Sequence, residues 1–402
     1  MKKTISFVLA LTIILGSFGA VFADETVTAP VPKTEPDALG MYFTGEEIKL
    51  SLDDALKIMT TTGPAYDAVQ LTKKGNDAAA RGQFEFIEAI EELQLATKHP
   101  TMGAIIESAA AQAGMPTSMN SLTGKQAELA KTFYRAYSPV AYEAGMNGIK
   151  NSTIQAYFGL LMTEEAYNIA KETCDIKETL YKNTQRKFQL GVASKMEVLL
   201  AESDYLSAQQ KEMEALATYN TTKMSFNMAM NFDLTQNVTL TDKLEMVTAP
   251  AIDIEKSIES ALTKRNELIK AKYDMDNALL QFNSVKAYPR NSATYMGGEA
   301  GYKGAELAYR MQLLTTELGL RQEYMSIQNL KAAVASAEKV AANAKEAARL
   351  SQLQYDAGMC TMTDLQTAQN NSAAAQLGVV SAIMNYNIAV YSFDYNSNAG
   401  IM

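Results

Sequence analysis

The chain has 402 residues, of which 20% are charged and 47% are hydrophobic, close to the average of globular proteins. Its formal net charge of -9 at pH 7 argues against nucleic acid as a partner. One histidine, His99, and two cysteines, Cys174 and Cys360, argue against a histidine-based metal site, a Ser-His-Asp triad and a disulfide framework. We also find no nucleophile motif or phosphate-binding glycine loop, and therefore expect a protein that is not an enzyme and needs no cofactor.

The first 23 residues have the pattern of a secretory signal peptide. The Lys2-Lys3 pair precedes an apolar run that ends at Leu15, and a small-x-small cleavage pattern ends at Ala23. We therefore predict export with cleavage after Ala23, which leaves the mature chain two charges more negative. The alternative is an uncleaved anchor, because the stretch from Ile5 to Ala23 is nearly long enough to span a bilayer.

The segment that follows the leader predicts extended and then helical structure. Residues 24–50 are rich in proline, threonine and acidic residues and are interpreted as an extended lead-in. Near Leu52 we predict a short helix, a break at Gly63-Pro64 and a longer helix. Residues 84–148 have apolar side chains at helical spacing and are interpreted as a helical or irregular insert.

The second half contains a shorter counterpart of this insert, residues 287–304, which is rich in glycine. Tyr288, Tyr295 and Tyr302 suggest strand there. In neither segment do apolar and polar residues alternate over the roughly ten residues that a membrane strand needs. We therefore expect little or no β-barrel.

One turn sequence occurs twice, at residues 188–197 and 355–364. In each copy a glycine, Gly191 or Gly358, can adopt the left-handed conformation that follows the last turn of a helix. Each copy therefore predicts a tight turn between two antiparallel helices.

The same copies also contain the start signal of the next helix. Ser194 can serve as an N-cap, and Glu197, three residues on, can complete a capping box. Thr361 and Asp364 form a weaker version of this box in the second copy.

The repeat extends well beyond the turn. Shifting the sequence by the distance between Gly191 and Gly358 superimposes these pairs without a gap: Gln155 and Gln322, Ala201 and Ala368, Tyr219-Asn220 and Tyr386-Asn387, and Phe226 and Phe393. Such self-similarity indicates one structural unit used twice. We assign residues 51–233 to repeat 1, 234–251 to a connector, 252–396 to repeat 2 and 397–402 to a tail.

Each repeat is predicted to end in a long helical hairpin, at residues 152–232 and 318–396. A continuous helix on either side of the first turn would be about 58 Å long, at about 1.5 Å per residue. Small and apolar residues recur at spacings of three and four, which is typical of coiled-coil seams. The stretch from Leu365 to Phe393 has no charged residue, but its many Asn and Gln side chains favour burial in an assembly over a bilayer span.

The two turns, each followed by a helix rich in alanine and glutamine, resemble the repeated tips of the TolC-type outer-membrane efflux proteins. The motif from Leu52 to Leu56 is similar to the opening helix of that family. The resemblance implies a mainly α fold of two tandem coiled-coil hairpins, the protomer of an α-barrel. It also implies a homotrimer, a periplasmic adaptor and an inner-membrane pump as partners, and a place in the outer membrane or periplasm, or at the cell surface where no outer membrane exists.

The resemblance assigns roles to residues of the two turns. It implies that the tip that meets the adaptor includes Phe188, Gly191, Ser194, Tyr355, Gly358 and Thr361. Tyr355 and Glu197 match a tyrosine-carboxylate pair of the family's gate, and Asp364 matches its first pore-lining aspartate. Three other gate positions differ from the family, because they are occupied by Met196, Cys360 and Thr367. A purely structural role as cap residues is the alternative for Glu197 and Asp364.

Two functions from different classes follow. The first is a trimeric efflux channel that guides small molecules or proteins and performs no chemistry. The second is a barrel-less envelope coiled-coil protein that serves as a spacer or adaptor, because the segments at which the family inserts membrane strands lack a strand pattern here.

Overall fold

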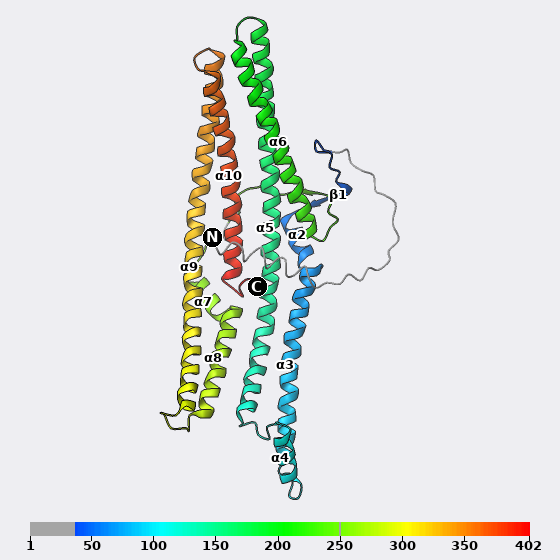
Figure 1. The fold of residues 1–402 in the computed structure, drawn as a ribbon, viewed down its shortest axis with the longest axis vertical. Coiled ribbons are helices and arrows are strands. Elements are labelled where there is room, and N and C mark those ends of the chain that lie inside the picture. The colour runs from blue at the N-terminus through cyan, green and yellow to red at the C-terminus, as the bar shows by residue number, and fades with distance from the viewer. Residues whose placement is uncertain (1–36, 249–250) are drawn as a thin grey trace.

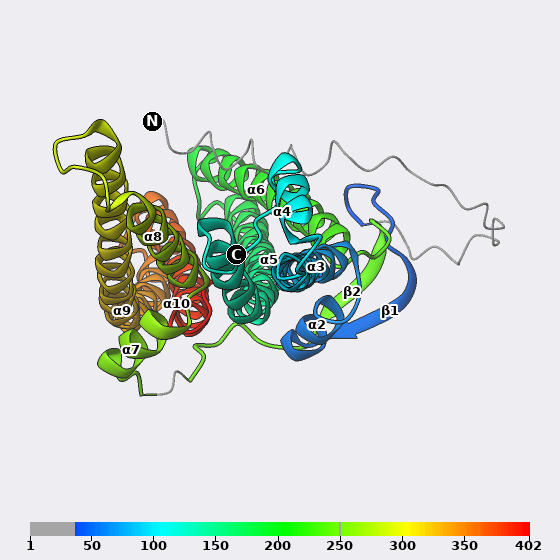
Figure 2. The same cartoon turned by 90° about the horizontal axis from the view of Figure 1, so that it is seen from below.

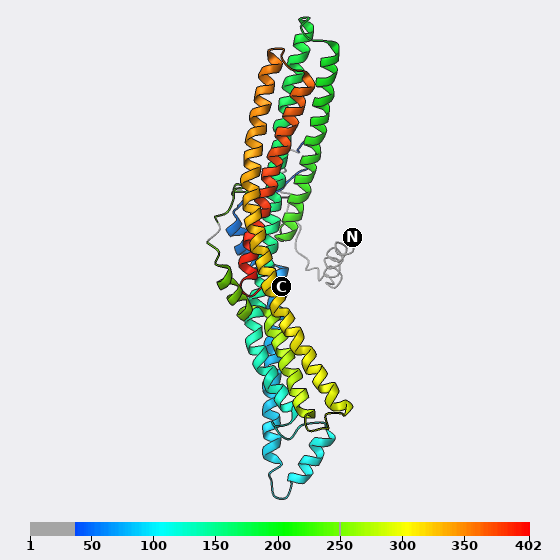
Figure 3. The ribbon, with the colours of Figure 1, turned by 90° about the vertical axis from the view of Figure 1, so that its left-hand side faces the viewer.

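The computed structural model describes residues 37–248 and 251–402 as an elongated molecule built largely from long helices (Figure 1). The predicted signal peptide and residues 24–36 of the predicted lead-in lie outside the described residues. Two hairpin turns lie at one end of the molecule, and helix α4 lies at the other (Figure 3).

From residue 37 on, the first half contains one strand and five helices: β1 (Thr44–Leu50), α2 (Leu52–Met59), α3 (Pro64–Ala96), α4 (Gly103–Gln112), α5 (Leu122–Gln189) and α6 (Lys195–Ala229). Local sequence explains several boundaries. Ser51 and Asp54 form a capping box at the start of α2. Gly63 has φ of 103° and precedes Pro64, which is the first residue of α3.

The second half contains β2 (Gln236–Leu240), α7 (Ile254–Lys264), α8 (Asn266–Val285), α9 (Ala293–Asp356) and α10 (Met362–Asn396). Helices α5 and α9 contain 68 and 64 residues, so each is about 100 Å long at about 1.5 Å per residue. Both begin well before the starts predicted at residues 152 and 318. The predicted hairpins are therefore only the upper parts of these helices.

The suggestion of strand at the second-half tyrosines is wrong, because Tyr295 and Tyr302 lie in α9. Ser292 caps this helix by accepting a hydrogen bond from the Tyr295 amide at 3.2 Å. Phe282 of α8 packs against both tyrosine rings, with centroid separations of 5.4 and 6.1 Å. Packing on α8 therefore stabilises a glycine-rich segment as helix, and periodicity read from the sequence alone does not include that contact.

The helices form one curved layer in each half of the molecule. In the upper half the order of neighbours is α6, α5, α10 and α9, and in the lower half it is α3, α5, α8 and α9 (Figure 2). Helices α5 and α9 therefore pass through both layers. Residues 84–148 form parts of α3 and α5 and the whole of α4, with non-helical connections at residues 97–102 and 113–121.

A small parallel sheet lies beside the middle of α5. Strands β1 and β2 pair with Thr44 opposite Gln236 and Leu50 opposite Leu240. Together with α2 this sheet buries apolar side chains of α5 and α6, including Ile154, Leu160 and Phe226, against its own Val238. The Tyr157 hydroxyl donates to the Leu50 carbonyl oxygen at 3.1 Å and also bonds Asp242 at 2.9 Å.

Two asparagines at equivalent positions of the repeats hold extended segments against the hairpins. Asn387 is fully buried, and its amide accepts from the Val247 backbone N–H at 2.9 Å and donates to the Glu245 carbonyl oxygen at 2.9 Å. Asn220 donates to the side chain of Asp37. The same repeat position thus fixes the segment that precedes each repeat.

Among the described helices, α10 is the one that is long and apolar enough to cross a membrane. Only 22% of its most apolar window is buried within the chain. It packs between α9 and α5 in the upper layer. Its remaining apolar surface is therefore available to a further packing partner.

Candidate functional site: the hairpin tips

Both hairpin turns have the backbone of a Schellman motif. In the first turn, Gly191 has φ of 75°, and the Val192 N–H donates to the Lys187 carbonyl oxygen at 2.9 Å. In the second, Gly358 has φ of 73°, and the Met359 N–H donates to the Gln354 carbonyl oxygen at 2.8 Å.

No heavy atom lies within 4 Å of a Cβ built on Gly191 or Gly358. Space therefore does not require glycine at these positions. The left-handed backbone favours glycine at both positions, because a Cβ atom raises the energy of this conformation.

Both predicted capping boxes are present. The Ser194 hydroxyl accepts from the Glu197 N–H at 3.2 Å, and the Glu197 carboxylate accepts from the Ser194 N–H at 2.7 Å. Thr361 and Asp364 make the same two bonds at 3.2 and 3.0 Å. The second box is therefore complete as well, and its carboxylate bond is longer than that of the first box.

The cap affects the acidity of Asp364. A hydrogen bond from the Thr361 hydroxyl, followed by one from the Thr361 backbone, lowers the pKa of the Asp364 carboxyl below its ordinary value of 3.8. Asp364 is therefore ionised at neutral pH, and its charge lies at the positive end of the α10 dipole.

The turns present apolar side chains to solvent. Leu190, Val192, Met196 and Met359 are among the most exposed large apolar residues of the described chain. Exposed apolar groups clustered at one end of a molecule indicate a contact surface for a partner.

The two aromatic residues that begin the turns have different environments. Phe188 is 42% exposed, with the Lys195 ammonium 5.9 Å from the centre of its ring. Tyr355 is only 8% exposed and packs in a small core with Leu180, Met362 and Leu365. Tyr355 therefore lies between the hairpins, whereas Phe188 belongs to the tip surface.

Burial is the main cause that raises the pKa of the Tyr355 hydroxyl. An interaction with the Thr184 hydroxyl lowers this pKa, and the nearby Glu197 carboxylate raises it. The Glu197 carboxylate accepts hydrogen bonds from Ser194, and its pairing with Tyr355 stays a prediction.

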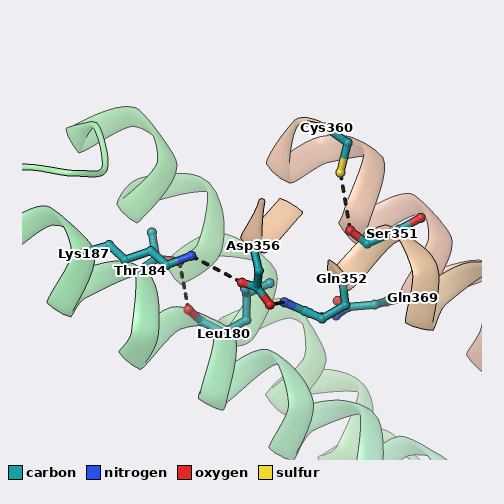
Figure 4. A network of polar contacts seen from close by, with 8 residues as sticks. All are labelled: Leu180, Thr184, Lys187, Ser351, Gln352, Asp356, Cys360 and Gln369. Atoms are coloured by element: carbon teal, nitrogen blue, oxygen red, sulfur yellow. Dashed lines mark hydrogen bonds and ion pairs between the residues drawn. The ribbon is translucent and has the colours of Figure 1, made fainter. Parts of the chain in front are cut away.

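A polar network joins the two hairpins just below the tips (Figure 4). The Lys187 ammonium of α5 lies 3.3 Å from the Asp356 carboxylate of α9. Gln352 donates to the other oxygen of Asp356 at 3.1 Å, and Gln369 of α10 donates to Gln352 at 3.4 Å. Three long helices therefore share one chain of polar contacts.

Sequence reasoning missed this network, although a signal for it exists. In the alignment of the two repeats, Lys187 corresponds to Gln354, and Asp356 corresponds to Gln189. The counterpart of Lys187 in repeat 2 and the counterpart of Asp356 in repeat 1 are thus both glutamines. The two charged residues face each other across the hairpins. A search for broken repeat symmetry would have found the pair.

The same signal marks a second missed ion pair. Lys177 of α5 is almost fully buried and lies 2.7 Å from the Asp204 carboxylate of α6. The equivalent residues of repeat 2 are Ala344 and Asn371. A buried lysine needs a close carboxylate partner. Because repeat 2 has neither of these charged residues, the pair is specific to the first hairpin.

The three positions that depart from the family's gate pattern are occupied as follows. The Cys360 thiol donates to the Ser351 carbonyl oxygen at 3.4 Å. The Thr367 hydroxyl donates to the Thr363 carbonyl oxygen at 2.8 Å, and Met196 is exposed. The gate role of Glu197 and Asp364 stays a prediction.

The remaining candidate chemistry is sparse. Within residues 37–248 and 251–402, no group of three or more His, Cys, Asp or Glu side chains could hold a metal ion. Cys174 is a buried free thiol, and burial raises its pKa to about 12.

Comparison with known proteins identifies the fold. No protein-family model and no curated protein matches the chain. Among solved structures, the outer membrane protein VceC of Vibrio cholerae is 13% identical, with a TM-score of 0.65, and the match covers 87% of this chain and 97% of VceC. The match to CusC is 11% identical with a TM-score of 0.65, and it covers 94% of this chain and 100% of CusC.

The MtrE outer membrane channel of Neisseria gonorrhoeae is also similar, at 14% identity and a TM-score of 0.63, covering 87% of this chain and 89% of MtrE. At these identities the likeness concerns the fold. The predicted TolC-like fold of tandem helical hairpins is confirmed.

Proposed function

We propose that this chain is the channel-forming component of a TolC-type efflux system in the cell envelope. Three copies form a helical conduit that exports small molecules or proteins, and the tips at residues 188–197 and 355–364 dock a periplasmic adaptor linked to an inner-membrane pump. The main support is that outer-membrane channels match this chain over almost their whole length.

The geometry of the chain supports an assembly of this kind. Each half of the molecule is a single layer of helices on which the short helices α2, α4 and α7 pack locally, so much of its faces and edges lacks a helical neighbour. Closing three layers around an axis buries the edges and leaves a central passage. Export through such a passage requires no reaction and no cofactor.

The tips supply the proposed contact with the adaptor. Both turns lie at the same end of the molecule, and both present exposed apolar residues, such as Val192 and Met359 (Figure 1). We assign the tip to the periplasm and the opposite end to the outer membrane. In a cell without an outer membrane, the conduit would lie at the cell surface.

A second candidate function is a spacer or adaptor in the envelope that does not conduct. The observation that favours it is the composition of the lower half. Helix α3 has nine charged residues among its 33, and such a helix is suited to water and not to lipid.

Planar-bilayer conductance of the purified mature protein, with its oligomeric state measured in the same preparation, separates the two functions. Trimers with stable unitary conductance support the channel. Trimers that neither insert nor conduct overturn the channel and support the spacer. A strict monomer contradicts both the trimer and the conduit.

Tip docking has its own test in the cell of origin. In a strain that lacks the chromosomal copy, Val192→Asp or Met359→Asp should raise ethidium accumulation severalfold relative to the unchanged chain. The control is Leu206→Asp, an exposed position along α6 away from the turn. Equal export by all three chains would contradict docking through the tips.

A further inference from the structure

A cavity of about 640 Å³ lies between the two hairpins, below the polar network that joins them. Its walls come from α5 of the first hairpin, from α9 and α10 of the second, and from the connector. Figure 2 shows the connector on the same face of the layer as α2 and α7. We call this space the connector cavity, and its volume is typical of small-molecule sites.

One wall of the connector cavity is apolar. Ile383, which is 8% exposed, belongs to the core of the second hairpin, and Leu244 and Val379 pack against that core. The members of this wall are Ile169, Leu244, Val379, Val380 and Ile383. Because the wall packs on a buried core, its shape is set before any ligand arrives.

The connector is held over the cavity by Asn387. The two hydrogen bonds of this side chain, to the Val247 N–H and the Glu245 carbonyl oxygen, fix the connector backbone. Leu244 packs against the cores of both hairpins. The backbone from which the Glu245 side chain projects is therefore positioned by buried contacts.

Negative charge surrounds the cavity. Four carboxylates line it, and a single ammonium, that of Lys243, accompanies them. The four are Glu165 and Glu172 of α5, Glu338 of α9 and Glu245 of the connector. Within residues 37–248 and 251–402, no ion pair or side-chain hydrogen bond involves any of the four. Unpaired carboxylates beside an apolar wall favour a cationic ligand with an apolar body.

The carboxylates fall into an upper and a lower group. Glu165 and Glu172 share one face of α5 and are separated by about 10 Å along it, at about 1.5 Å per residue. Glu338 lies nearly as far from the tip end of α9 as Glu172 lies from the tip end of α5, so these two form the upper group. Glu245 is bonded to Asn387, which lies about as far down α10 as Glu165 lies down α5. Glu165 and Glu245 therefore form the lower group.

A smaller cavity of about 60 Å³ adjoins the upper group and shares Ile169 and Glu172 with the connector cavity. Gln369 lines it, and the buried Oε1 atom of this side chain accepts no hydrogen bond from any residue that the structure describes. Lys177 also lines it, but the charge of this lysine is paired with Asp204. A buried acceptor without a donor favours a ligand that carries N–H groups.

We propose that the connector cavity binds an elongated organic dication, whose two cationic groups carry N–H donors and are joined by an apolar body. One cationic group binds between Glu172 and Glu338. The other binds beside Glu165 and Glu245, and the apolar body lies along the wall that contains Val379. Every lining residue belongs to one copy, so the proposal goes beyond the proposed function and depends on neither the trimer nor the adaptor.

Two effects favour this ligand. Charge-assisted hydrogen bonds form at both of its ends, and each is stronger than a bond between neutral groups. The apolar body leaves water when it covers the wall. Because the carboxylates belong to both hairpins and to the connector, a bound dication links these segments and stabilises their arrangement by mass action.

Isothermal titration calorimetry of the purified mature protein with three amines tests the two-ended site. Octamethylenediamine has two ammonium groups on a chain long enough to reach both groups of carboxylates. Octylamine has the same chain with one ammonium group, and putrescine has two ammonium groups on a shorter chain. We expect octamethylenediamine to bind once per chain with a Kd at least about tenfold lower than that of either other amine, because this probe alone makes both ionic contacts and covers the wall.

Two variants locate the binding. Glu165→Gln removes a carboxylate of the lower group and Glu338→Gln one of the upper group, and each should raise the Kd of octamethylenediamine about fivefold or more. The Kd of octylamine should change less than about twofold, because one end of the site stays intact. The control is Glu259→Gln at an exposed position of α7, which removes the same charge away from the cavity. Circular dichroism checks that each variant is folded.

Equal affinity for octamethylenediamine and octylamine would assign the cavity to a singly charged amphiphile and overturn the two-ended site. A Glu259→Gln effect as large as those of the cavity variants would reduce the binding to the net charge of the chain and overturn the site as well. The oligomeric state of the same preparation separates this proposal from the proposed function. A trimer that conducts but binds no diamine overturns the site alone, whereas a monomer that binds the diamine contradicts the conduit and supports the site.

Discussion

Lys187 and Asp356 form an ion pair within the last turns of α5 and α9, and this pair links the two hairpins immediately below their tips. The Lys187 ammonium also lies 4.9 Å from the ring centre of Tyr355. The lysine and aspartate side chains are 37% and 55% exposed, so the pair stabilises the fold by about 0–1 kcal/mol. Its importance is its position, because it connects hairpins that a tip opening would separate.

Replacing Lys187 with glutamine should therefore loosen the tips with little loss of global stability. We expect amide hydrogen exchange over residues 350–360 to accelerate up to about fivefold, while the free energy of unfolding falls by less than about 1 kcal/mol. Lys182→Gln is the control, because Lys182 pairs with Glu178 of its own helix. An equal effect of both changes on α9 would contradict the link.

Replacing Gly191 or Gly358 with alanine should cost about 1 kcal/mol each in the free energy of unfolding, because alanine resists the left-handed backbone at these turns. The matched control is Gly378→Ala in the interior of α10, where the Cβ also meets no atom within 4 Å. That change should stabilise the protein by up to about 1 kcal/mol. Denaturant unfolding of the three variants measures the difference, and three effects of one sign would be inconsistent with it.

The Asp364 cap should make stability depend on acid pH. Its folded-state pKa is lowered, so its contribution is present above the ordinary value of 3.8 and is lost as the pH falls through the lower folded-state value. Asp364→Asn should therefore lower the Tm at pH 7, and this difference should shrink as the pH falls below 3.8. Thermal unfolding between pH 7 and the acid range is the measurement, and a Tm difference that does not shrink with falling pH would rule out this origin.

Asn387 should be essential for holding the connector between the repeats. Asn387→Leu removes two buried hydrogen bonds and leaves the Val247 N–H and the Glu245 carbonyl without these partners, at a cost of about 2–4 kcal/mol. Asn385→Leu, at an exposed position two residues earlier, should change the stability by less than about 0.5 kcal/mol. Similar losses for both variants, measured by urea unfolding, would argue against this role.

The sequence by itself was sufficient for the features that depend on neighbours along the chain. The turns at residues 188–197 and 355–364 each place a glycine and a cap residue within a few positions of a helix end, so local backbone energetics determine them. The duplication is likewise visible without any structure, and it led to the correct fold of paired hairpins.

The tertiary structure decided the features that depend on contacts between distant segments. Helix α9 extends into the lower half because packing on α8 stabilises a glycine-rich segment with little helical signal of its own. Tyr355 is buried while Phe188 is exposed, although both begin the same motif. The difference arises because Tyr355 faces the first hairpin, whereas Phe188 does not face the second. No pattern within a single repeat specifies which of the two residues is buried.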